Sequence, residues 1–185
     1  QRKRALEEDT VIQRQRKQIL EFRERALTRQ DLDGLAKDLI KRQILRLQKE
    51  YLPGAAPGEQ EIRELERECA GLFGVRYAAG PRFDTAKELG GIYGDLALFA
   101  YEERAKLFGG EWEQARSMLL LHCIDRGWRN HLYALEELKK NRPLAEKGAA
   151  SPANVFIKNS YRIYSETCAW IEQEYLFQLF HAKPS

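Results

Sequence analysis

The sequence predicts an all-α protein in which one long helix and a later antiparallel pair of long helices flank a group of shorter helices. Three observations predict this class. Apolar residues recur three or four positions apart through most of the 185 residues, which is the period of a helix packed on one face. No segment shows the strict alternation of a half-buried strand. Clusters of glycine and proline fall between the periodic segments and break them.

The first predicted helix covers residues 3–27. Its apolar residues form one narrow stripe, which is typical of a long helix that packs on one side only. The stripe contains Leu6, Val11, Ile12, Ile19, Leu20, Phe22 and Leu27. Because Gln1 already stands in the helical pattern, we interpret the sequence as part of a longer chain.

Shorter helices follow. Thr28 or Asp31 is the expected N-cap of a helix that runs to about Tyr51, and the Pro53–Gly58 stretch ends it. The next predicted helices cover residues 59–73 and 85–107. The second of these contains three glycines, which we expect to let another helix approach closely; they are Gly90, Gly91 and Gly94.

Two long helices complete the pattern, at residues 111–140 and 153–180. Asn141-Arg142-Pro143 ends the first, and Ser151-Pro152 supplies an N-cap and a proline at the first position of the second. The connection of about ten residues predicts an antiparallel hairpin.

The expected domain organisation is therefore bipartite. Residues 1–27 and 111–185 would form a discontinuous helical scaffold, and residues 28–110 a smaller helical domain inserted into it.

Composition restricts the function only weakly. The chain is 43% hydrophobic and 32% charged, with a net charge of +3. Residues 1–29 carry nine Lys or Arg against five Asp or Glu. A solvated helix with i,i+4 ion pairs is the favoured interpretation of this segment, and a polyanion-binding stripe is the alternative.

The cysteines and histidines give no clear site. Cys69, Cys123 and Cys168 are far apart and form no CxxC pair, which indicates buried thiols in a reducing compartment. A zinc site built from His122, Cys123 and His131 is the alternative, but their spacing is not that of zinc ligands and a structural role is favoured. No apolar run approaches 18 residues, so we expect no membrane-spanning helix.

No catalytic motif is present in the sequence. It has no phosphate loop ending in GK[ST], no HExxH and no GxSxG, and its carboxylates alternate with Lys and Arg on predicted solvated faces. We therefore predict no catalytic residue, no metal ligand and no cofactor site in this chain. The aromatic residues share their helical spacing with Leu and Ile, which indicates core packing and gives no strong nucleic-acid signal.

Two motifs resemble the SecA preprotein-translocase ATPase family. The stretch Leu121–Leu138 is similar to the LD-x-x-W-x-x-HL-x-x-M-x-x-L pattern of the family's two-helix finger, through Ile124, Asp125, Trp128, His131 and Leu132. Farther along, Ser151-Pro152 falls on an Asp-Pro of the pattern and Phe156 on a Tyr.

The second motif lies in the first helix. Leu6-Glu7-x-Asp9-x-Val11, Gln15-Arg16, Ile19 and Arg23 resemble the LEYDDV…QR…I…R segment that follows the SecA motor. The two motifs stand in the family's order and separation, and the resemblance covers almost the whole chain.

The resemblance implies an architecture and a role. Residues 1–27 and 111–185 would be the scaffold with its two-helix finger, and residues 28–110 the wing. The finger loop would contact the preprotein and the SecY channel; its residues are Leu144, Ala145, Glu146, Lys147, Gly148 and Ala149. Ile124, Trp128 and Leu132 would clamp the finger to its neighbours, whereas Asp125 and His131 would each bond to another part of the molecule.

The implied partners are the parent protein's own motor domains, the preprotein and the channel. ATP and Mg²⁺ would bind to the parent motor, outside this chain. The protein would be cytoplasmic or peripheral at the inner face of the cell membrane. Three positions depart from the family pattern: Ala145 replaces the usual tip Arg, Lys147 the tip Tyr, and Gly127 a Leu.

Two functional hypotheses follow. The first is a non-catalytic scaffold of a SecA-type translocation ATPase, which couples motor movement to the finger loop. The alternative is a helical adaptor or nucleic-acid-binding module that uses the basic first helix as its contact surface.

Overall fold

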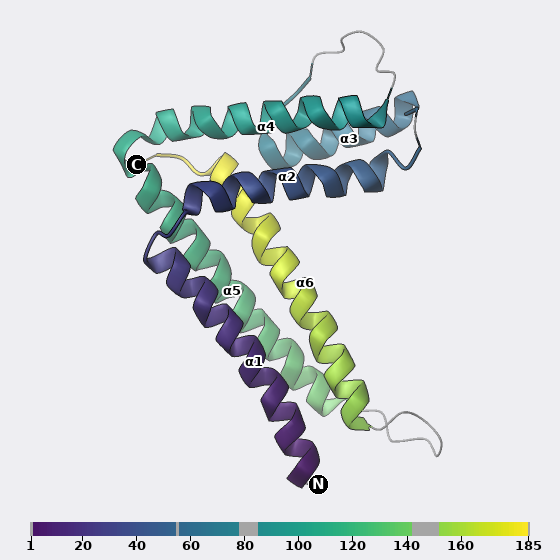
Figure 1. The fold of residues 1–185 in the computed structure, drawn as a ribbon, viewed down its shortest axis with the longest axis vertical. Helices are drawn as coiled ribbons and strands as arrows, with labels where there is room; N and C mark the ends of the chain where they lie inside the picture. The colour runs from purple at the N-terminus through teal and green to yellow at the C-terminus, as the bar shows by residue number, and fades with distance from the viewer. Residues whose placement is uncertain (1, 55, 78–84, 142–151, 185) are drawn as a thin grey trace. The chain divides into compact units, whose positions relative to one another are not determined.

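The computed structural model describes residues 2–54, 56–77, 85–141 and 152–184, and in these ranges the regular structure is helical throughout. These ranges contain six α-helices, which Figure 1 labels. They are α1 (Arg2–Leu27), α2 (Leu32–Tyr51), α3 (Glu59–Phe73), α4 (Ala86–Phe108), α5 (Trp112–Lys140) and α6 (Pro152–His181), with a short 3₁₀ turn η1 (Gly109–Glu111) between α4 and α5. The all-α prediction is confirmed, and every predicted helix is present.

Local chemistry explains where the shorter helices begin and end. Asp31 caps α2 by accepting a hydrogen bond from the Gly34 amide at 3.1 Å, so Asp31 and not Thr28 is the N-cap. Thr85 caps α4 in the same way through the Glu88 amide at 3.2 Å. Gly74 ends α3 in a left-handed conformation with φ of 68°, which a residue without Cβ adopts at little cost.

The chain divides into two compact units. The first unit comprises Gln1–Gln30 and Leu120–Glu172, and the second comprises Asp31–Leu119 and Gln173–Ser185. Both α5 and α6 therefore contribute one part of their length to each unit. The scaffold and wing boundaries at residues 27 and 110 stay a prediction.

In the first unit, α1 packs with the 120–140 part of α5 and the 152–172 part of α6. Along α5 and α6 the contacts run in opposite directions. Gly127 lies against Ile171, His131 near Thr167, and the Lys139 ammonium 5.9 Å from the ring centroid of Phe156. These parts of the two helices are thus antiparallel, as the hairpin prediction required.

In the second unit, α2, α3 and α4 pack together with the start of α5 and the end of α6 (Figure 1). Aromatic rings occupy the interior: Phe180 contacts Phe73 at 5.1 Å and Tyr101 at 6.5 Å between ring centroids, and Trp112 lies 5.5 Å from Tyr101. The Arg104 guanidinium donates to the Leu179 carbonyl at 3.2 Å and also to that of Ala182, which satisfies free carbonyls at the end of α6.

The glycines of α4 differ from one another. A Cβ on Gly90 would lie 2.4 Å from the Gln48 side chain of α2, so this glycine does allow a close approach. Gly91 and Gly94 have no heavy atom within 4 Å of that position, and the expectation of a close helix contact is not met for them in the described structure. Both lie away from the face of α4 that packs on α2.

Candidate functional site

The motif residues of α5 follow the helical period, and this decides which of them are buried. Ile124 and His131 are buried, and Trp128 is half-buried. Leu132 is 39% exposed in this chain, and its expected role in clamping the finger to its neighbours stays a prediction. It follows His131 directly, and adjacent helical residues point about 100° apart.

Asp125 joins α5 to α1. The Arg23 Nε donates to Asp125 Oδ1 at 3.0 Å, and this bond and the carboxylate charge raise the pKa of Arg23. Both side chains are partly exposed, so the pair adds little to stability. Its geometry shows which turns of α1 and α5 lie side by side.

His131 lies at the meeting point of the three helices in the first unit. Its Nε2 is 2.9 Å from Gln15 Oε1 on α1, and Gln15 Nε2 donates to the Ser160 carbonyl on α6 at 3.2 Å. Since the amide oxygen of Gln15 only accepts, His131 Nε2 carries the proton in this bond. We call His131, Gln15 and Ser160 the junction.

Burial sets the protonation state of the junction. It lowers the pKa of His131 to about 4, because the imidazolium would lose its hydration. The ring also stacks on Trp128 at 5.1 Å and meets Tyr164 edge-on at 5.6 Å between ring centroids. His131 is therefore a neutral, structural imidazole at neutral pH.

The junction brings the two family motifs together. Gln15 and Arg23 belong to the motif in the first helix, and His131 and Asp125 to the motif in α5; each pair is separated by more than 100 residues in sequence. The sequence placed the four residues in motifs but gave no partner for any of them. No local signal could have found these pairs, because they depend on the antiparallel packing of α1 against α5.

The remaining motif residues lie nearer the hairpin connection. Pro152 is the first residue of α6, and Phe156 is buried beneath Lys139. The predicted contact loop, residues 144–149, lies outside the described residues.

Gly127 explains one departure from the family pattern. A Cβ there would lie 2.4 Å from Ile171 Cγ1 and 3.3 Å from Trp170 Cε3. Helices α5 and α6 therefore approach so closely at this point that the leucine usual in the pattern has no room.

The apolar residues of α1 divide into two lines. Val11, Ile19 and Ala26 are buried within the first unit, whereas Leu6, Leu20 and Leu27 are 69%, 52% and 48% exposed. The apolar residues that the sequence placed in a single stripe therefore lie on two faces of α1, one buried and one exposed. The exposed leucines are separated by multiples of seven residues, which is the spacing of a helix-packing seam.

The second unit contains an ion pair that the sequence did not indicate, between a buried arginine and a half-exposed aspartate. Arg116 on α5 lies 3.0 Å from Asp33 on α2 and donates to Tyr101 Oη on α4 at 2.8 Å. Burial alone would raise the pKa of Asp33, but bonds and charges from Lys37, Tyr101 and Arg116 outweigh it and lower the pKa. The signal that was available is the position of Arg116 one helical turn after the buried Trp112.

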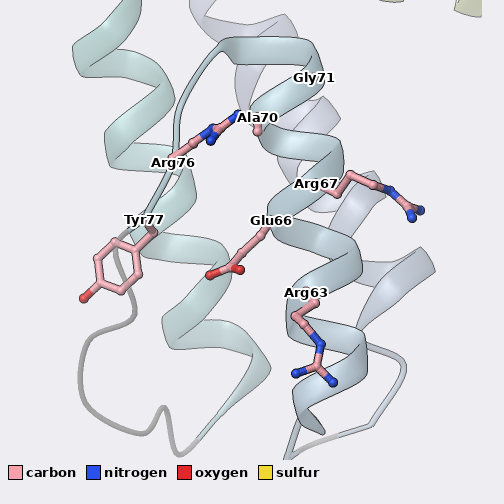
Figure 2. A pocket seen from close by; sticks show the side chains of 7 residues that line it. All are labelled: Arg63, Glu66, Arg67, Ala70, Gly71, Arg76 and Tyr77. Atoms are coloured by element: carbon pink, nitrogen blue, oxygen red, sulfur yellow. The ribbon is translucent and has the colours of Figure 1, made fainter.

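A pocket lies beside α3 (Figure 2). It has a volume of about 570 Å³, and its lining residues are Arg63, Glu66, Arg67, Ala70, Gly71, Arg76 and Tyr77. Figure 2 shows Arg67 directed away from Tyr77, so the three guanidinium groups do not converge on one point. Glutamates pair with two of them, at 3.4 Å for both Arg63–Glu59 and Arg67–Glu68. We find no constellation for acid–base or nucleophilic chemistry in this pocket.

The described residues also gather no metal site. No group of three His, Cys, Asp or Glu side chains among them is placed to hold an ion. His122 is exposed while Cys123 and His131 are buried, so the three members of the alternative zinc site face different ways. Of the helices in the described ranges, none is long and apolar enough to cross a membrane.

The fold and the junction define a class of protein: an all-α module whose long helices, distant in sequence, are joined by specific polar contacts. Comparison with known proteins gives the family. A family model described as the SecA Wing and Scaffold domain matches residues 1–183. The chain belongs to this family.

Curated relatives agree with this membership. The protein translocase subunit SecA of Gloeobacter violaceus is 26% identical over 100% of this chain and 20% of its own length. SecA of Thermosipho africanus is 28% identical over 96% of this chain and 20% of the relative's length. SecA of Micrococcus luteus is 25% identical over 100% of this chain and 21% of the relative's length. The chain thus spans about a fifth of the length of these relatives.

Proposed function

We propose that this chain is a mechanical scaffold within a SecA-type protein-translocation ATPase, without catalytic residues of its own. In this role it couples nucleotide-driven movement of the motor domains to the loop at residues 144–149. That loop contacts the preprotein and the SecY channel. ATP and Mg²⁺ bind to the motor of the parent protein, which works in the cytoplasm or at the inner face of the cell membrane.

The observation that carries the proposal is the double link between α1 and α5. Gln15–His131 and Arg23–Asp125 lie about two turns apart on α1, so they resist both sliding and rotation of one helix against the other. Gln15 also reaches α6 through the Ser160 carbonyl. A displacement applied to α1 is therefore transmitted to both helices that lead to the loop.

The exposed leucines of α1 supply the input surface. Leu6, Leu20 and Leu27 form an apolar line on the side of α1 that faces away from α5 and α6. In this proposal the motor domains of the parent protein pack on that line, so their movement reaches α1 directly.

ATP hydrolysis by the full-length parent protein tests the proposal, measured with and without reconstituted channel and an unfolded preprotein. Stimulation by both supports a working translocase, and indifference to both refutes the assigned role of the loop. Lys147→Ala then tests the loop itself and should reduce the stimulation, with Lys49→Ala on an exposed part of α2 as the matched control. Tight, strongly salt-dependent binding of single-stranded nucleic acid without such stimulation would favour the alternative function.

A further inference from the structure

The outer face of α4 carries an exposed apolar row. Phe99 and Leu107 are 61% and 58% exposed, and Ile92 and Leu96 beside them are half-buried. Leu96, Phe99 and Leu107 stand four, seven and fifteen positions after Ile92, so the four residues share one side of the helix. We call this line and its acidic flank the α4 outer face.

The opposite side of α4 is already occupied. Leu89, Tyr93, Ala97 and Tyr101 are buried within the second unit, where α4 packs on α2 and α3. Helix α4 thus carries apolar residues on two sides, and only one of them is covered in the described structure. A helix that is apolar on two sides is normally covered on both.

Acidic residues flank the exposed row. Glu88, Asp95 and Glu102 follow one another at seven-residue spacing and are all exposed, and Glu103 lies within the row itself. Lys106 adds one positive charge, but its ammonium lies 2.6 Å from Glu103. The Lys37 ammonium approaches Glu102 only to 3.9 Å. The α4 outer face is therefore negative along most of its length.

We propose that the α4 outer face is a docking surface for a basic amphipathic helix. The spacing of its apolar row is that of a helix-packing seam, and an acidic flank selects a partner with Lys or Arg beside its own apolar seam. The same charge repels nucleic acid and anionic lipid. From Glu88 to Leu107 the face is about 30 Å long, which accommodates a helix of about 20 residues. This surface is independent of the loop and of the junction on which the proposed function depends.

The test uses the full-length protein and a fluorescein-labelled helical peptide of leucine and lysine in heptad order. Fluorescence anisotropy should detect binding that weakens with added salt. Phe99→Ser should weaken it at least tenfold, and the double substitution Asp95→Lys with Glu102→Lys should weaken it about tenfold and reduce its salt dependence. Leu45→Ser is the matched control, because Leu45 on α2 is exposed to a similar extent, and it should leave binding unchanged.

Several results would overturn the inference. The first is that the peptide does not bind. The second is that a peptide with glutamate in place of lysine binds with the same affinity. The third is that Leu45→Ser weakens binding as much as Phe99→Ser does. Self-association of the protein that Phe99→Ser abolishes would assign the face to a second copy and also refute the occupant proposed here. Thermal unfolding followed by circular dichroism verifies that Phe99→Ser is folded, which its exposure leads us to expect.

Discussion

Substituting Gly127 with alanine tests the close approach of α5 and α6 most directly. In an exposed helix interior this change stabilises a protein by about 1 kcal/mol, because glycine loses more backbone entropy on folding. Gly127 should behave in the opposite way. Its new Cβ would lie 2.4 Å from Ile171 Cγ1 and 2.8 Å from Ile171 Cδ1. Both distances are shorter than the contacts that Cβ atoms make in folded proteins, so the two side chains would clash.

The magnitude follows from what can move. Ile171 is fully buried and β-branched, so it has few alternative rotamers. Overpacking of this kind costs about 1–3 kcal/mol. After the helix-propensity gain of about 1 kcal/mol is subtracted, we expect Gly127→Ala to lower the free energy of unfolding by up to about 2 kcal/mol.

Urea unfolding measures this change. Circular dichroism reports helix loss, and tryptophan fluorescence reports both units, since Trp128 and Trp170 belong to the first unit and Trp112 to the second. The matched control is Gly91→Ala in α4, which has no heavy atom within 4 Å of the new Cβ and should stabilise by up to about 1 kcal/mol.

A double-mutant cycle adds the decisive comparison. In an Ile171→Ala background the clash is absent, so Gly127→Ala should cost at least about 1 kcal/mol less than in the native background. The reasoning is refuted if Gly127→Ala stabilises the protein as much as Gly91→Ala does, or if the cycle shows no coupling.

Three further predictions concern titration. The pKa of Asp33 is lowered by Lys37, Tyr101 and Arg116, which contributes stability above pH about 4 that is lost as the pH falls through the lowered pKa. Asp33→Asn should therefore flatten the acid side of a plot of unfolding free energy against pH, measured with urea. An unchanged plot would contradict the pairing of Asp33 with these three residues. His131 has a folded pKa of about 4 against an ordinary 6.5, so the unfolded chain binds more protons between these values. The free energy of unfolding should fall by on the order of 3 kcal/mol as pH drops from about 6.5 to about 4, and His131→Gln should remove this slope; parallel curves would disprove it. Burial raises the pKa of the Cys69 thiol to about 12, so Ellman's reagent at neutral pH should modify Cys69 only after unfolding, and rapid reaction of the native protein would contradict the burial.

Much of the secondary structure could be predicted from the sequence. The predicted helix 59–73 matches α3, and the predicted 111–140 and 153–180 agree with α5 and α6 to within one residue at each end. The family motifs were also visible in the sequence, and the family is confirmed. These features depend on residues a few positions apart: a 3.6-residue period, a capping side chain, or a proline without an amide proton.

What the sequence left open depends on contacts between distant segments. It offered one apolar stripe on α1, whereas packing against α5 and α6 buries Val11 and leaves Leu20 exposed. It gave no partner for His131 or Arg116, because an amide 116 residues away and a carboxylate 83 residues away share no local pattern with them.

The amino-acid sequence by itself thus determined where helices form, where they stop and which family the chain belongs to. Only the tertiary structure decided which face of each helix is covered and which polar groups pair, and why position 127 is glycine. The physical reason is that helix formation is governed by neighbours along the chain, whereas burial of Gln15 or room for a Cβ beside Ile171 depends on helices that meet only after folding.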